Sequence, residues 1–380
     1  MFERAAWLRT SLLVLFAGMI AACGGGTMKT PAPPACVPST QPEFAYVLNG
    51  DPANTVSMYT INSCTGSLTP TTPATIPTGV NSESMVVDPS GKFVYVANLV
   101  SNASDLATIS MYTIDPTTGV LTATTPPTVP TGFLPQGIAI DPTGKFVYTA
   151  NSDDNTVSMF TVDSTTGILT PTTPPSVAAG SSPTGIAVDP NGKFAYATNE
   201  DDDTISMYSI NATTGILTAL TPATAPAPGI LFPGTVDPSG KFFYVPDNGD
   251  TFVLMFTIDP TSGLLTQNMP PEATTGNGPT SVAVDPSSKF AYVVNRPDDT
   301  ISMFTIDPET GNLTPNTPSS IIASGEPFTI LVDPSGKFVY VTDEAGSVSI
   351  YGINSDGTLT STTSVATIFP LSIAITGKSQ

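Results

Sequence analysis

The chain has 380 residues and a formal net charge of −20 at pH 7, because 31 acidic side chains stand against only 11 basic ones. A protein this acidic repels nucleic acid and anionic lipid unless its few cations cluster, so a nucleic-acid-binding function is excluded. The sequence contains no histidine, which also excludes the commonest general base near neutral pH and every histidine-based catalytic triad.

Residues 1–22 predict a cleaved export signal. Two arginines precede an apolar stretch over 11–20 that is too short to cross a bilayer. The segment Ile20–Cys23 then resembles the bacterial lipobox, in which the cysteine is acylated and becomes the new N-terminus. Gly24 stands where an aspartate would favour the inner membrane, which implies an outer-membrane lipoprotein held by its lipid anchor alone. An ordinary signal peptide with an incidental cysteine is the alternative.

Residues 23–41 predict a tether, flexible where three glycines follow Cys23 and stiffer where prolines take over. If Cys23 carries lipid, Cys36 and Cys64 remain as a pair in an oxidising compartment, where a disulfide can form. Such a bond would close the tether onto the folded part. Two unrelated buried cysteines stay open as the alternative, because a sequence does not supply the Cα separation that a bridge requires.

A repeated motif organises the rest of the chain. The block Asp-Pro-[Ser/Thr/Asn]-x-Lys-Phe recurs at intervals of 48 residues, with one interval of 53, and a Phe-x-Tyr pair follows the same period. Repeats of this length indicate propellers or solenoids. There are seven units, whose tyrosines are Tyr46, Tyr95, Tyr148, Tyr196, Tyr244, Tyr292 and Tyr340.

Each unit predicts four short β-strands, which we name A to D from the channel outward. In the fourth unit these strands are expected over 184–189, 193–199, 204–210 and 215–220, each bounded by turn residues. No run shows a helical apolar stripe. Four antiparallel strands in each of seven units predict an all-β, seven-bladed β-propeller. The recurrent methionine of strand C is expected to pack between blades.

The two ends of the repeat array predict how the ring closes. The first unit has no strand A before Phe44, while 371–376 matches a strand A and then stops. The C-terminal strand should therefore complete the first blade. The propeller is predicted over 42–377 with a short tail over 378–380, which leaves no residues for a second domain.

Acidic residues are expected to collect on one face of the ring. The AB turns, which carry six lysines, lie on the opposite face, and the BC and DA loops are rich in acid. Glu83, Glu272 and Glu326 are assigned to DA loops, and Arg296 is the only cation expected there, hence the one candidate for contact with an anion. The first interpretation is a solvated face on which Asp and Asn form turns.

The alternative for this face is a site for calcium or for a cationic partner. No cofactor is expected, and calcium is kept only as the alternative, because no loop has the spacing of a calcium-binding loop and its support is compositional. A partner, if any, is expected to be neutral or basic, and the protein to be monomeric. The candidate metal ligands are Asp201, Asp202, Asp203, Asp247 and Asp250.

Symmetry-breaking residues at the channel mouth are the candidate ligand site. The residue five before each repeat aspartate, and its equivalent in the C-terminal strand, varies among the blades, and four of these seven residues are polar and three aromatic or aliphatic. Such a ring suits an uncharged or cationic organic ligand, although anchoring of the DA loops is an equal alternative. We call it the mouth ring: Glu83, Gln136, Thr184, Phe232, Thr280, Phe328 and Leu371.

The segment from Pro279 to Asn295 resembles the seven-bladed β-propeller lactonases, relatives of 6-phosphogluconolactonase, and the YVTN-repeat surface propellers. The resemblance extends over nearly all of 42–377 and implies the propeller fold. The family's enzymes have Pro-Arg-His at the start of strand A, where this chain has Pro-Thr-Ser at 279–281. Only Glu200 matches the acid that follows the family's Tyr-Val-x-Asn run.

Two functions stay open at this point. The missing Arg-His pair favours a non-catalytic recognition or scaffold propeller of the cell envelope, without catalytic residues. The alternative is a lactone hydrolase resembling 6-phosphogluconolactonase. A phosphorylated lactone would need cations to hold its phosphate, and Arg296 alone faces a field of acid.

Overall fold

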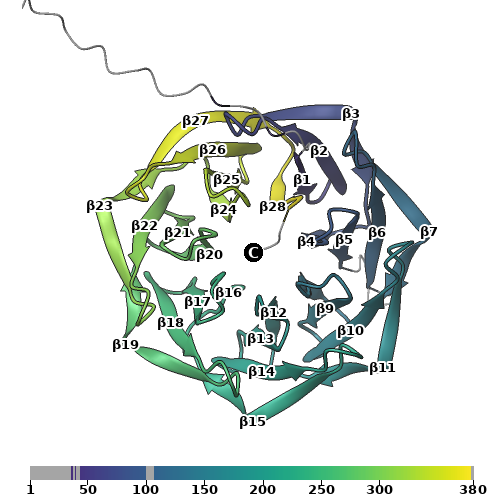
Figure 1. Ribbon diagram of the computed structural model, residues 1–380, viewed down its shortest axis with the longest axis horizontal. Coiled ribbons are helices and arrows are strands. Elements are labelled where there is room, and N and C mark those ends of the chain that lie inside the picture. Colours follow the sequence, from purple (N-terminus) through teal and green to yellow (C-terminus); the bar gives the residue numbers. More distant parts are fainter. Residues whose placement is uncertain (1–35, 37–38, 40–42, 100–106, 378–380) are drawn as a thin grey trace, which may run out of the picture. The chain divides into compact units, whose positions relative to one another are not determined.

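The computed structural model describes residues 36, 39, 43–99 and 107–377. The chain divides into two compact units, 1–37 and 38–380, and every strand lies in the second. There, 28 strands form seven four-stranded antiparallel sheets, which are the blades of a ring (Figure 1). The part of the chain that the structure describes contains no helix. The predicted seven-bladed β-propeller is therefore confirmed.

The strands of each blade run from the channel to the perimeter in the predicted order A to D. Strands A are β4 Ser82–Val87, β8 Pro135–Ile140, β12 Pro183–Val188, β16 Thr235–Val236, β20 Pro279–Val284, β24 Pro327–Val332 and β28 Pro370–Ile375. Strands B are β1 Glu43–Asn49, β5 Phe93–Asn98, β9 Phe146–Asn151, β13 Phe194–Asn199, β17 Phe242–Asp247, β21 Phe290–Asn295 and β25 Phe338–Asp343.

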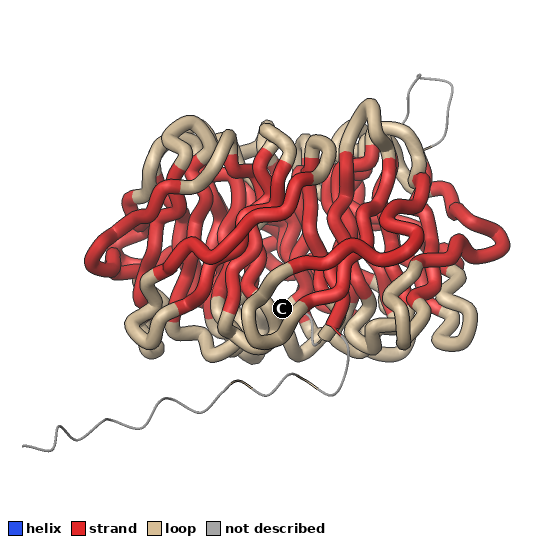
Figure 2. The backbone as a smooth tube through the Cα atoms, turned by 90° about the horizontal axis from the view of Figure 1, so that it is seen from above, coloured by secondary structure: helices blue, strands red, loops and turns tan. Residues whose placement is uncertain are grey.

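The outer half of each blade is built the same way. Strands C are β2 Thr55–Ile61, β6 Thr108–Ile114, β10 Thr156–Val162, β14 Thr204–Ile210, β18 Phe252–Ile258, β22 Thr300–Ile306 and β26 Ser347–Ile353. Strands D are β3 Leu68–Pro77, β7 Leu121–Pro130, β11 Leu169–Ala178, β15 Leu217–Pro226, β19 Leu265–Thr274, β23 Leu313–Ile322 and β27 Leu359–Ala366. The loops gather at the two ends of the strands (Figure 2).

The C-terminal strand completes the first blade, as predicted. Strand β28 pairs antiparallel with β1, with Ala45 opposite Ile375, and the two strands lie side by side in Figure 1. The amide of Phe44 donates a hydrogen bond of 2.9 Å to Thr376 Oγ1, and the amide of Thr376 donates one of 2.9 Å to the Phe44 carbonyl. The two ends of the repeat array are thus joined in one sheet.

A tyrosine of strand B ties each blade to the next. Its buried hydroxyl donates a hydrogen bond of 2.8 to 3.0 Å to a glycine carbonyl in the CD turn of the following blade. The seven pairs are Tyr46–Gly119, Tyr95–Gly167, Tyr148–Gly215, Tyr196–Gly263, Tyr244–Gly311, Tyr292–Gly357 and Tyr340–Gly66. Because a buried hydroxyl and a buried carbonyl satisfy each other, the Phe-x-Tyr motif specifies blade contacts.

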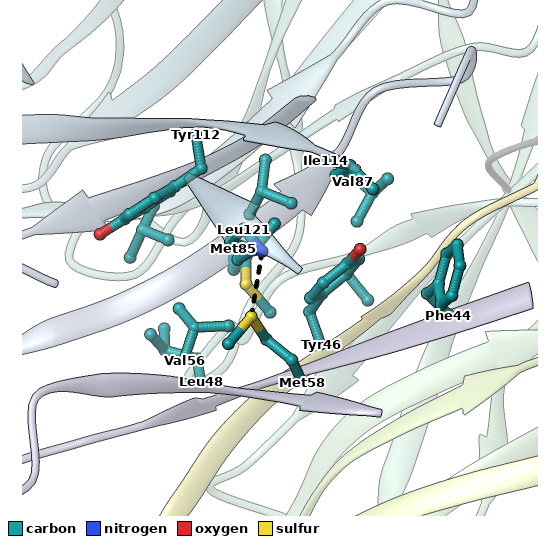
Figure 3. Close-up of a cluster of buried hydrophobic side chains, with 13 residues drawn as sticks. Phe44, Tyr46, Leu48, Val56, Met58, Met85, Val87, Tyr112, Ile114 and Leu121 are labelled. Carbon is teal, nitrogen blue, oxygen red and sulfur yellow. Dashed lines mark hydrogen bonds between the residues drawn. The ribbon is translucent and has the colours of Figure 1, made fainter. Parts of the chain in front are cut away.

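The strand C methionines pack between blades, which confirms the sequence prediction. Met58 is buried, and its sulfur accepts a hydrogen bond of 3.1 Å from the Leu121 amide at the start of β7 in the next blade (Figure 3). The same contact recurs in five further blades. These side chains are part of the core.

The repeat aspartate holds the AB turn through the backbone. Asp333 Oδ1 accepts hydrogen bonds from the amides of Lys337 and Phe338, at 2.9 and 2.8 Å. A carboxylate that accepts several amide hydrogens stabilises a tight turn. The constant spacing within the repeated motif therefore serves local structure.

Strand D differs from the sequence prediction. In the fourth blade β15 begins two residues later than expected and continues to Pro226, with a shift of register between Ser206 and Tyr208 on its partner strand. An outermost strand pairs on one side only, so prolines and irregular pairing are tolerated there. Glu272 accordingly lies exposed in β19 on the perimeter, so its assignment to a DA loop was wrong, as was that of Glu83, which lies in β4.

Candidate functional site

All seven residues of the mouth ring line one cavity of about 450 Å³ at the BC and DA end of the channel. Glu200 and Leu99, from BC loops, line it as well. Binding of a ligand there stays a prediction. The structure does bring together, from seven different blades, side chains that are far apart in the sequence.

β-Bulges account for the inward position of the ring. In β12, Pro183 lies opposite Asn199 and Gly185 lies opposite Thr198, so Thr184 between them is the extra residue of a bulge. The same shift leaves five other ring residues unpaired, namely Glu83, Gln136, Thr280, Phe328 and Leu371. A bulge re-aims a side chain at the end of a strand, and here it supplies the residues that line the cavity.

The fifth blade departs from this rule. Its strand A, β16, has only two residues, and the preceding segment is held by a single bridge between Leu231 and Asp247. Phe232 reaches the cavity from this irregular segment, and its amide donates a hydrogen bond of 3.1 Å to the Pro246 carbonyl.

Threonines of the ring fix neighbouring blades to each other. Thr184 Oγ1 donates to the Leu231 carbonyl at 2.9 Å, and Thr280 Oγ1 donates to the Phe328 carbonyl at 2.7 Å. These hydroxyls are used as donors by the protein itself. They leave Glu83 of the ring and Glu200 beside it as the cavity groups with acid–base chemistry.

One side of the cavity is aromatic. The rings of Phe232 and Phe328 meet edge to face, with centroids 6.4 Å apart and planes at 80°. The guanidinium carbon of Arg296 lies 5.7 Å from the centroid of Phe328, a geometry typical of a cation–π contact. Arg296 also forms ion pairs with Glu344 and, at 3.3 Å, with Glu326.

The carboxyls at the mouth hold their protons more tightly than usual. Burial raises the pKa of Glu83, and the nearby charge of Glu344 raises it further. Burial and then the charge of Asp201 raise the pKa of Glu200. For Glu344, burial raises the pKa more than Arg296 lowers it. Carboxyls with raised pKa values in a cavity are candidates for acid–base catalysis.

The candidate metal ligands are only partly brought together. Asp201, Asp203, Asp247 and Asp250 line an open concavity of about 620 Å³. Asp202 does not line it, and accepts a hydrogen bond of 2.6 Å from the Ser181 amide instead.

Backbone amides occupy several of these carboxylates. Asp203 accepts from the Gly229 amide at 3.1 Å, and Asp247 accepts from the Ile230 amide at 2.9 Å. Within the described residues, no group of three or more His, Cys, Asp or Glu is arranged to hold a metal ion. The contacts fit the interpretation in which these residues form turns, and calcium binding stays a prediction.

A family model described as "Lactonase, 7-bladed beta-propeller" matches residues 36–181, 176–233 and 234–378. The chain belongs to this lactonase family. No curated protein matches it by sequence. The membership agrees with the resemblance that the repeat motif indicated.

Several solved structures share the fold of this lactonase-family propeller. A candidate 6-phosphogluconolactonase from Bacteroides uniformis is 23% identical, with a TM-score of 0.74 over 88% of this chain and 99% of that one. A second, from Bacteroides fragilis, is 20% identical, with a TM-score of 0.72 over 89% and 99%. A periplasmic gluconolactonase from Pseudomonas aeruginosa is 18% identical, with a TM-score of 0.73 over 89% and 100%. At these identities the likeness shows the fold alone.

The structure places two carboxyls in or beside the mouth cavity that sequence reasoning did not assign to it. Glu200 matched the family's acid but was not assigned to the mouth, and Glu344 was only one of many acids in BC loops. No sequence signal marked Glu344, because its contacts with Arg296 join loops of two blades.

Some predictions concern residues outside the described ranges. The lipobox cysteine Cys23 and the export signal are among them. Cys36 and Cys64 are each disulfide-bonded in the structure, while the pairing of one with the other stays a prediction. Within the described residues, no helix is long and apolar enough to span a membrane.

Proposed function

We propose that this propeller hydrolyses uncharged lactones in the cavity at its channel mouth. One observation carries the proposal: Glu83 and Glu200, two carboxyls with raised pKa values, line the same cavity in a member of the lactonase family. The structural neighbours described as lactonases support it. This is the alternative of the sequence analysis, and the comparisons favour it over the scaffold function.

The chemistry needs one base and one acid. The Glu200 carboxylate takes a proton from water, which attacks the lactone carbonyl carbon. The C–O bond to the ring oxygen then breaks, and the protonated Glu83 carboxyl gives that oxygen a proton. The product is an open-chain hydroxy acid, and both carboxyls return to their starting state by proton exchange with solvent. Without histidine in the chain, carboxyls are the groups able to fill both roles.

Phe232 and Phe328 suit the apolar face of a lactone ring, since sites for small organic ligands combine apolar walls with a few polar groups. Glu83 is the more deeply placed of the two carboxyls, which favours the protonated form that a general acid needs. We further propose that the protein acts in the cell envelope, anchored through Cys23 as the Ile20–Cys23 segment suggests.

A second candidate is recognition of a lactone or related sugar without turnover. It is favoured by one observation, the absence of the family's Arg-His pair at Pro279–Ser281. Turnover separates the two candidates.

The test is hydrolysis of glucono-1,5-lactone by the purified protein, measured against spontaneous hydrolysis in buffer. Glu200→Gln and Glu83→Gln should each lower kcat on the order of a hundredfold or more. Glu272→Gln, on the exposed perimeter, is the matched control and should leave the rate unchanged. A rate no higher than that of buffer would reject the hydrolase and leave the recognition function.

A further inference from the structure

Arg296 is placed beside the mouth but committed to the protein's own carboxylates. Its guanidinium pairs with Glu344 and Glu326 and lies over Phe328. The Glu344 side chain is only 14% exposed, so this pair is shielded from solvent on one side. The backbone also fixes Glu326, whose amide donates a hydrogen bond of 2.7 Å to Asp299.

The cluster leaves no positive charge for a ligand. Two carboxylates, Glu326 and Glu344, pair with the one guanidinium. The charge of Glu344 also acts on Glu83, whose pKa it raises. The residues that line the cavity include Glu83 and Glu200 and no cation. Every other lysine or arginine within the described ranges is an AB-turn lysine at the far end of the strands. An anionic group entering the mouth therefore meets net negative charge.

We propose that Glu344 and Glu326 set the substrate charge of this site by occupying Arg296, so that the mouth accepts uncharged lactones and rejects phosphorylated ones. The inference rests on the proposed function for the reaction but concerns binding alone. A ligand that brings a negative charge next to carboxylates of the protein is disfavoured by electrostatic repulsion. Specificity of this kind is built from repulsion as well as attraction.

The geometry makes Arg296 a masked anion site. Arg296 lines a concavity of about 470 Å³ that shares Phe232 with the mouth cavity. Phe328, over which the guanidinium lies, is a wall of the mouth cavity itself. A guanidinium freed of its two carboxylates would thus stand at the edge of the cavity, with the planar donor fork that binds phosphate.

The experiment is calorimetric titration with 6-phosphogluconate at low salt. The unchanged protein should show no measurable binding. The double variant Glu344→Gln with Glu326→Gln should gain affinity on the order of tenfold or more, and adding Arg296→Ala should abolish the gain. The control double variant Glu272→Gln with Glu309→Gln removes the same charge from exposed positions that line neither concavity and form no ion pair with Arg296, and should gain nothing.

Two results would overturn the inference. One is binding of 6-phosphogluconate to the unchanged protein that is lost on changing Arg296→Ala. The other is a Glu344 and Glu326 double variant that binds no better than the control. Because the titration needs no turnover, a failure of the hydrolysis assay leaves this test intact, and an active lactonase that binds 6-phosphogluconate through Arg296 would reject only the charge selection.

Discussion

The Tyr340 hydroxyl donates a hydrogen bond of 2.8 Å to the Gly66 carbonyl, 274 residues earlier in the chain. This contact joins the last blade to the first and repeats the one that joins every other neighbouring pair. The ring is therefore closed both by the shared sheet of the first blade and by the same side-chain contact used throughout.

Changing Tyr340→Phe should lower the free energy of unfolding by about 1–3 kcal/mol, because the buried Gly66 carbonyl loses its donor. Tyr148→Phe, at an ordinary blade contact, is the matched control and should cost the same. Denaturant unfolding measures both. A much smaller effect at Tyr340 would mean that the closing contact adds no stability.

Gly119 should not tolerate a side chain. Its φ is +71°, and a Cβ there would lie 2.2 Å from the Phe44 ring of the preceding blade. We expect Gly119→Ala to cost at least about 2 kcal/mol of unfolding free energy, from the left-handed backbone and from crowding in the core. Gly352→Ala, where the nearest atom would be 3.8 Å away, should be neutral or stabilising by up to about 1 kcal/mol. Equal effects of the two changes would contradict this account.

Glu83 should make the fold less stable as pH rises. Burial raises the pKa of its carboxyl above the ordinary value of a glutamate, so between the unfolded and folded pKa values the folded state binds more protons. The free energy of unfolding must then fall as pH increases through that window. Glu83→Gln should remove this part of the fall, which thermal unfolding from pH 4 upward would reveal as a flatter profile. If the stability of the variant fell with pH in parallel with that of the unchanged protein, the contribution of Glu83 would be contradicted.

Anchoring through Cys23 can be tested in cells. If the Ile20–Cys23 segment is a lipobox, Cys23→Ser removes the acylated residue and should release the protein from the membrane fraction, because a lipid chain supplies the membrane affinity. Immunoblots of fractionated cells measure this. Protein that stays with the membrane after the change would reject lipid anchoring.

Periodic features of the sequence were enough to predict the architecture. The Asp-Pro and Phe-x-Tyr motifs count the blades, and the strand missing before Phe44 and present at 371–376 predicts the closure. The mouth ring follows from the same register, since the residue at this position of strand A is the extra residue of a β-bulge in six of the seven blades. Such inferences succeed because each repeat folds against a copy of the same neighbour.

Contacts between residues that occupy different positions in the repeat were decided only by the tertiary structure. Arg296 looked like the one cation available to an anion, and it is instead occupied by Glu326 and Glu344, 30 and 48 residues further on. The position of Glu272 on the perimeter likewise depends on how far an edge strand continues. Periodicity specifies which backbone positions face each other, whereas the partner of a single charged side chain depends on loops of neighbouring blades that break the repeat.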